Sequence, residues 1–153
     1  MADVFISHSS SDREFAEFLQ RHLVSEGLTV FLAPLSLTPG QKWPQEILNA
    51  LKTSTWVFFL ASRAACESPW VQQELGAAMA TQKKLVPITW DTPPSELPGW
   101  IGHIQALDLR GASADVITQH FASIADAIKA DKAKGMLIGG LLVAGLLFFL
   151  SKG

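Results

Sequence analysis

The sequence predicts an α/β domain built on a parallel, doubly wound β-sheet. Short apolar runs alternate along the chain with stretches of helical periodicity. Residues 56–61 are apolar without interruption, as in a central strand that helices cover on both faces. Strand–helix units of this size favour parallel pairing through right-handed crossovers. We therefore expect one open sheet with helices on both sides.

Each element of this sheet has its own signal. We expect the first strand at 3–7, followed by a helix that begins with a capping box, Ser11–Glu14, and ends at Gly27. Pro87 suggests that the fourth strand lies near an edge, because proline cannot donate to a strand ladder. The other expected strands are 28–32, 56–61, 85–89 and 104–109, and the other expected helices carry Ile47–Leu51, residues 69–82 and Ile117–Ile128. Five strands of this kind fit the flavodoxin-like order 2-1-3-4-5.

Composition narrows the class of protein. Of 153 residues, 48% are hydrophobic and 17% charged, which excludes a disordered chain, and the net charge of −2 argues against nucleic acid as a partner. Cys66 is the single cysteine, so an internal disulfide framework is excluded. The amino end lacks the basic start of a secretory signal, which predicts folding in a reducing cytoplasm.

The end of the chain differs from the body. Residues 135–151 carry no charge and follow a basic stretch, 131–134. We interpret 135–151 as a hydrophobic transmembrane helix and 131–134 as a juxtamembrane linker, with lysines that keep the domain 1–130 in the cytoplasm. This predicts a single-pass protein of the inner membrane. The alternatives are a buried helix in an oligomer core and a short hydrophobic plug.

One glutamate of the expected helix 69–82 has no local explanation. Glu74 has no basic residue three or four positions away, and Trp70 shares its helix face. A carboxylate beside an indole suits a substrate that has a flat aromatic group and develops a positive charge as it reacts. NAD⁺ is such a substrate when its nicotinamide–ribose bond breaks. A bond from Glu74 to a neighbouring loop, or simple exposure to solvent, is the alternative.

Sheets of this order bind ligands beyond the carboxyl ends of their strands, between strands 1 and 3. Ser7 ends the first expected strand, His8 and Ser9 follow it, and Ser62 follows the third. Their side chains offer hydrogen bonds to a ligand, although serines also suit the approach to a helix cap and His8 also suits an ordinary turn. No phosphate-binding glycine motif of the P-loop or Rossmann type is present.

Four segments together resemble a Toll/interleukin-1 receptor (TIR) domain of bacterial type: residues 3–9, 37–43, 59–62 and 68–75. The resemblance implies a flavodoxin-like fold, assembly through TIR–TIR contacts and NAD⁺ hydrolysis or cyclisation. It implies that Glu74 is catalytic and that NAD⁺ is a substrate, with no cofactor or metal. The substrate-binding residues it implies, together with Ser62, are Phe5, Ser7, His8, Ser9, Pro34, Trp43 and Trp70. Trp43 also suits the alternative of anchoring its loop to the body.

The leading functional hypothesis is a membrane-anchored NAD⁺ nucleosidase that self-assembly activates. It would give nicotinamide and linear or cyclic ADP-ribose, in bacterial immune defence by the resemblance. One alternative is a non-catalytic module that recruits other TIR proteins to the membrane. Another is an effector that disrupts the membrane when its TIR domains oligomerise. Release of nicotinamide from NAD⁺ separates the first hypothesis from the second.

Overall fold

The computed structural model of the chain describes residues 2–34, 45–67, 76, 84–99, 101 and 104–134. Its centre is a parallel sheet of five strands in the order β2-β1-β3-β4-β5. The strands are β1 Val4–His8, β2 Val30–Pro34, β3 Trp56–Leu60, β4 Lys84–Thr89 and β5 Leu107–Asp108. The predicted α/β class and strand order are both confirmed.

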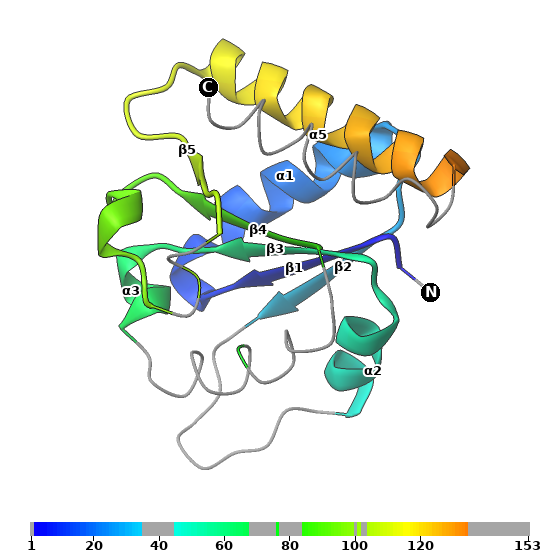
Figure 1. Cartoon of the computed structure of the whole chain (residues 1–153), viewed down its shortest axis with the longest axis horizontal. Helices are drawn as coiled ribbons and strands as arrows, with labels where there is room; N and C mark the ends of the chain where they lie inside the picture. Colours follow the sequence, from blue (N-terminus) through cyan, green and yellow to red (C-terminus); the bar gives the residue numbers. More distant parts are fainter. Residues whose placement is uncertain are drawn as a thin grey trace.

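Helices cover the two faces of the sheet (Figure 1). Two helices, α1 (Arg13–Ser25) and α5 (Ala114–Lys134), lie on one face, and α2 (Gln45–Thr53) and α3 (Arg63–Cys66) lie on the other. Short 3₁₀ helices, η1 (Ser10–Asp12) and η2 (Pro94–Glu96), complete the described elements. The strands point toward the end of the sheet where α3 lies, so this end is the carboxyl edge of the sheet.

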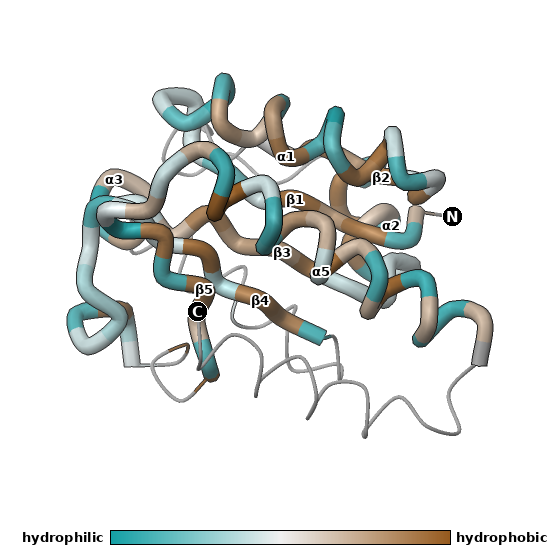
Figure 2. The backbone as a smooth tube through the Cα atoms, turned by 90° about the horizontal axis from the view of Figure 1, so that it is seen from above, coloured by the Kyte–Doolittle hydropathy of each residue, from teal (hydrophilic) through white to brown (hydrophobic). Residues whose placement is uncertain are grey.

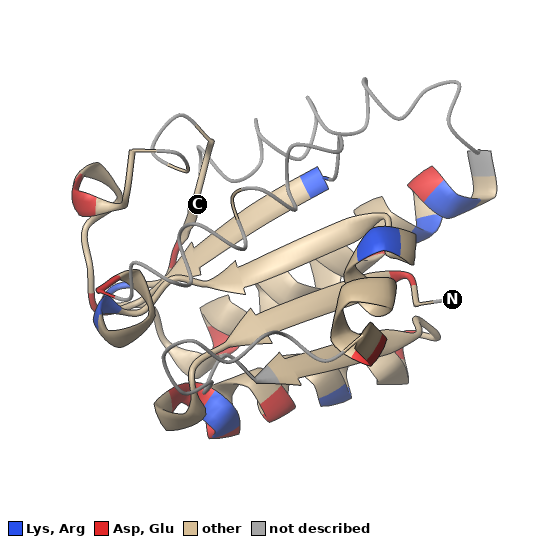
Figure 3. Cartoon of the chain, turned by 90° about the horizontal axis from the view of Figure 1, so that it is seen from below, with Lys and Arg blue, Asp and Glu red and all other residues tan. Residues whose placement is uncertain are grey.

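Alternation along β1 divides the core into two layers. Val4 and Ile6 pack with the α1 and α5 residues Leu19 and Phe121, whereas Phe5 packs on the opposite face with Leu51 of α2. The strands therefore form a hydrophobic band through the middle of the molecule (Figure 2). Charged residues are concentrated on the helices and loops outside that band (Figure 3). Burial on both faces explains why the strands read as nearly continuous apolar runs.

The first helix ends as the sequence predicts but begins differently. Gly27 has φ 88°, the left-handed conformation that favours glycine after a helix. The expected capping box at Ser11–Glu14 is not formed: the residue at the N-cap is Asp12, and its side chain makes no capping hydrogen bond. The Asp12 carboxylate instead binds serine hydroxyls outside the helix.

The position of Pro87 agrees with the expectation. Its strand, β4, lies next to the edge strand β5, with β3 on its other side. The Ile88 carbonyl accepts from Ala61 on the β3 side, whereas the Thr89 carbonyl accepts from Leu109 on the β5 side. Pro87 shares the direction of Thr89, and pairing with β5 begins only at Ile88. The N–H that proline lacks therefore costs no ladder hydrogen bond.

Two further expectations concern residues outside the described ranges. Of the expected helix 69–82, the structure describes Gly76 alone, and residues 135–151 are likewise not described. Among the helices that the structure does describe, none is long and apolar enough to cross a membrane. The predicted transmembrane helix is therefore not supported, and the predicted inner-membrane location is corrected on this finding.

Candidate functional site

The carboxyl ends of β1 and β3 lie side by side and bring the candidate polar residues to one edge. Ser7 is paired with Phe59 across the β1–β3 ladder, and Ser62 follows β3 two residues beyond its end. On the other side of β1, His8 is the register partner of Pro34 in β2. This is the point at which the strand order reverses, where flavodoxin-like sheets bind their ligands.

Two side chains at the end of β1 hold buried polar atoms that lack a partner. Ser7 is 0% exposed and His8 is 2% exposed. Neither Ser7 Oγ nor His8 Nδ1 has a hydrogen-bond partner within the described part of the protein. Buried polar atoms are nearly always hydrogen-bonded in native proteins, so each exception calls for an explanation, of which a catalytic or binding role is one. Both residues are thus suited to contact a bound molecule.

The environment of His8 favours its neutral form. Burial lowers the pKa of the imidazole below its usual value, and the positive charge of Arg13 lowers it further. The carboxylates of Asp12 and Glu17 and a hydrogen bond to the Ile6 backbone act in the opposite direction but do not reverse the shift. A neutral imidazole has one donor and one acceptor, so His8 can offer its remaining nitrogen to an uncharged polar group of a ligand.

Asp12 connects the turns that follow β1 and β3. Its Oδ2 atom accepts a hydrogen bond of 2.6 Å from Ser9 Oγ and one of 2.5 Å from Ser62 Oγ. The distances are those of strong O–H···O⁻ hydrogen bonds. Ser9 and Asp12 are half-buried and Ser62 is 2% exposed. The carboxylate thus fixes both hydroxyls across the switch point.

The start of α3 is held from two directions. Ser62 is the N-cap residue of α3, and its hydroxyl accepts a hydrogen bond from the Ala65 N–H at 3.3 Å. The Asp91 carboxylate, which follows β4, accepts from the Arg63 N–H at 3.0 and 3.2 Å. The hydroxyl of Thr92 also donates to Asp91. Groups that follow β3 and β4 therefore converge on the first turn of α3.

A cavity of about 300 Å³ lies beside α3. It is lined by Arg63, Cys66, Glu67, Thr92, Glu96 and Pro98. Burial, together with the nearby charges of Asp91 and Glu67, raises the pKa of the Cys66 thiol to about 11. The thiol is therefore protonated at neutral pH and is a poor nucleophile.

The other candidate residues are placed as follows. Phe5 is fully buried, and its ring stacks on Phe31 with 5.7 Å between the ring centroids. The backbone of Pro34 ends β2. Trp43, Trp70 and Glu74 lie outside the described residues. In the part of the chain that the structure describes, no three His, Cys, Asp or Glu side chains form a group suited to a metal ion.

Two carboxylates at this edge, those of Asp12 and Asp91, were not predicted from the sequence as site residues. Asp12 falls inside a segment that reads as a helix cap, and Asp91 follows a strand without a recognisable motif. Ser62 lies 50 positions from Asp12. The single local sequence feature that points to Asp12 is its place directly after the serine-rich segment 7–11. This pattern is too common to identify a site.

Comparison with known proteins identifies the family. The model of the TIR domain family matches residues 4–124, so the chain belongs to the TIR domain family. The TIR domain of the Toll-related receptor TRR-2 of Hydra magnipapillata has the same fold, with a TM-score of 0.65 and 22% identity over 84% of this chain and 99% of that one. This likeness agrees with the strand order described above.

Two relatives have names that refer to NAD⁺ chemistry. The "Probable 2' cyclic ADP-D-ribose synthase BdTIR" of Brachypodium distachyon is 32% identical over 97 residues, which cover 62% of this chain and 43% of that protein. The "NAD(+) hydrolase TcpA" of a Theionarchaea archaeon is 33% identical over 92 residues, 58% of this chain and 28% of that protein. The chain thus matches less than half the length of either relative.

Proposed function

We propose that this TIR domain cleaves the nicotinamide–ribose bond of NAD⁺. The observation that carries the proposal is a pair of buried polar atoms, Ser7 Oγ and His8 Nδ1, which have no partner among the described residues and lie at the switch point of the sheet. The chemistry is that of the relatives, because both an NAD⁺ hydrolase and a cyclic ADP-ribose synthase share about a third of the matched residues with this chain. The substrate is NAD⁺, and we assign no cofactor.

The reaction needs few groups from the protein. The bond between C1′ of the ribose and the pyridinium nitrogen breaks, and its electron pair stays on the nitrogen, so nicotinamide leaves neutral. The ribose then has oxocarbenium character at C1′. Water adds there to give linear ADP-ribose, or a hydroxyl of the same molecule adds to give a cyclic form, and in either case the added oxygen loses its proton to solvent. Glu74 is our proposed catalytic carboxylate, since one negative charge suffices to stabilise this cation.

The remaining proposed contacts come from several segments. We propose that Ser7, His8, Ser9 and Ser62, at the carboxyl ends of β1 and β3, make polar contacts to the substrate. Phe5, Pro34, Trp43 and Trp70 complete the proposed binding residues. We further propose that copies of the domain associate through TIR–TIR contacts and that association activates cleavage, in a defensive depletion of NAD⁺. High local concentration of the domain would then raise activity per molecule.

Incubation of the purified chain with NAD⁺, followed by chromatography of nicotinamide and ADP-ribose species, tests the proposal. We expect nicotinamide release that rises more than linearly with protein concentration. Glu74→Gln should abolish release, whereas Glu46→Gln, at an exposed position in the first turn of α2, should not. Absence of nicotinamide from concentrated, folded wild-type protein would leave a non-catalytic interaction module. Undiminished turnover in Glu74→Gln would remove Glu74 as the catalyst.

A further inference from the structure

Two serine hydroxyls at the switch point use their protons in hydrogen bonds within the protein. Ser9 Oγ and Ser62 Oγ each donate to the same oxygen of Asp12, at 2.6 and 2.5 Å. A hydroxyl has one proton, and an ionised carboxylate accepts but cannot donate. The direction of both hydrogen bonds is therefore fixed, and neither serine retains a donor for another molecule.

The acceptor capacity of the two oxygens can be counted in the same way. Ser11 Oγ lies 3.0 Å from Ser9 Oγ, and because the Ser9 proton is already used, Ser11 is the donor of that pair. Ser62 Oγ accepts from the Ala65 N–H. A hydroxyl oxygen has two acceptor sites, so one remains on Ser9 and one on Ser62. Both serines can offer a ligand an acceptor and no donor.

We propose that Asp12 is a positioning residue that presents Ser9 and Ser62 to the substrate as hydrogen-bond acceptors. This inference rests on the proposed binding of NAD⁺ at this edge of the sheet. The groups that bind there must then be donors, and in NAD⁺ these are the ribose hydroxyls and the carboxamide NH₂. Asp12 acts through the serines and does not itself touch the reacting atoms.

The variant Asp12→Asn separates this role from a general effect on folding. The amide keeps the shape of the side chain but is neutral, so the two serines either donate to a weaker acceptor or, where the NH₂ group takes the place of Oδ2, accept from residue 12 and turn their protons outward. In both arrangements the serine protons are held less firmly and compete with the donor groups of the substrate. We expect KM for NAD⁺ to rise roughly tenfold, the usual scale for losing a hydrogen bond to a ligand, while kcat changes little.

Three further variants serve as controls and as an independent test of the KM measurement. Asp12→Glu keeps a charged acceptor and should return KM toward the wild-type value. Asp126→Asn makes the same chemical change at a side chain that is 75% exposed on α5, and it should leave KM unchanged. Ser9→Ala removes one acceptor without touching Asp12, so it should raise KM even if Asp12→Asn does not fold. Wild-type KM in folded Asp12→Asn, or in Ser9→Ala, would overturn the proposal.

A readout without substrate separates this inference from the proposed function. Amide hydrogen exchange at Ala65, followed by NMR, reports on the Ser62 cap and should become faster in Asp12→Asn but not in Asp126→Asn. Faster exchange with an unchanged KM would refute the positioning role and leave NAD⁺ cleavage standing. If the wild type binds NAD⁺ without cleaving it, the dissociation constant replaces KM in the comparison. If it neither binds nor cleaves NAD⁺, both proposals fail.

Discussion

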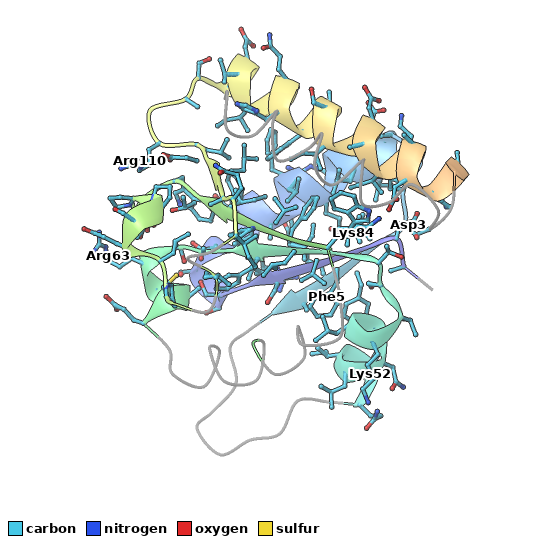
Figure 4. The ribbon with its side chains drawn as sticks, in the orientation of Figure 1. Asp3, Phe5, Lys52, Arg63, Lys84 and Arg110 are labelled. Atoms are coloured by element: carbon cyan, nitrogen blue, oxygen red, sulfur yellow. The ribbon has the colours of Figure 1, made fainter. Side chains whose placement is uncertain are left out.

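The indole Nε1 of Trp56 donates a hydrogen bond of 3.2 Å to Oδ2 of Asp131, 75 positions later in the chain. Lys84 donates to the same carboxylate oxygen, and its ammonium lies 5.4 Å from the centroid of the Trp56 ring. Asp131 is 5% exposed. The last turns of α5 are thus joined to the first residues of β3 and β4. Lys84 and Asp3 lie at the opposite end of the sheet from Arg63 (Figure 4).

Removal of the cation from this cluster should weaken the fold strongly. In Lys84→Met the Asp131 carboxylate stays buried and loses its counter-ion, and Oδ1 already lacks a partner in the described structure. We expect the free energy of unfolding to fall by about 3 kcal/mol, measured by urea denaturation. Lys132→Met is the matched control: its lysine is 61% exposed and pairs with Asp3, so a loss of less than about 1 kcal/mol is expected. Equal losses in the two variants would contradict a special stabilising role of Lys84 as the counter-ion of Asp131.

The variant Ser7→Ala should lower activity on NAD⁺ without lowering the stability of the fold. Its buried hydroxyl has no described partner, so Ser7→Ala removes no hydrogen bond within the described fold, and the free energy of unfolding should stay the same or rise. If the hydroxyl binds substrate, kcat/KM for NAD⁺ should fall roughly tenfold. The control Ser54→Ala removes a buried hydroxyl that donates to the Ala50 carbonyl at 2.6 Å. That variant should lose about 1 kcal/mol of stability and keep its turnover. A stability loss in Ser7→Ala as large as that in Ser54→Ala would show that Ser7 serves the fold.

The lowered pKa of His8 predicts how stability changes with pH. In the folded protein burial keeps the pKa of His8 below its usual value of 6.5, whereas in the unfolded chain it returns to that value. Below pH 6.5 the unfolded state therefore binds more protons, and stability falls as the pH drops toward the folded pKa. Above pH 6.5 His8 is neutral in both states and contributes no slope.

Urea denaturation at pH 8.0 and pH 5.5 checks this expectation. His8→Phe, which cannot titrate, should lose less stability between the two pH values than the wild type. Part of the slope should remain, because burial also lowers the pKa of His120. Identical pH dependence in the two proteins would show that His8 titrates alike in the folded and unfolded states.

Cys66 should react slowly with alkylating reagents in the folded protein. Its pKa of about 11, against a usual value of 9.0, reduces the thiolate at pH 7.5 by about 100-fold, and the thiolate is the reactive form. Intact-mass spectrometry after treatment with iodoacetamide should show little modification in buffer and rapid, single modification in 8 M urea. The absence of other cysteines makes the result unambiguous. Rapid labelling of the native protein would refute a half-buried thiol that is protonated at this pH.

The fold could be predicted from sequence because its determinants are local. Uninterrupted apolar runs such as Trp56–Leu60 mark strands buried on both faces, and Gly27 marks a helix end. The strand of Pro87 lies near an edge as predicted, but the reason that proline is tolerated there depends on the length of β5, which is a property of a neighbouring strand. A residue's own sequence context carries no such information.

The candidate site was predictable only in its location. The topological rule identified the ends of β1 and β3, and Ser7, His8 and Ser62 are found there. The role of Asp12 was not predictable, since its two partners come from different loops and the segment Ser11–Glu14 also satisfies the pattern of a helix cap. Glu74, Trp70 and Trp43 remain predictions.

The pairing of Lys132 with Asp3 brings the two ends of the described domain together. Lys129 adds a second tie to Glu26, at 2.7 Å. Both ends therefore emerge at one pole, and the serine-lined edge occupies the other. A fluorescent protein or purification tag fused on either side of residues 2–134 would start from the pole away from that edge, which makes the domain a convenient cassette for engineered fusions.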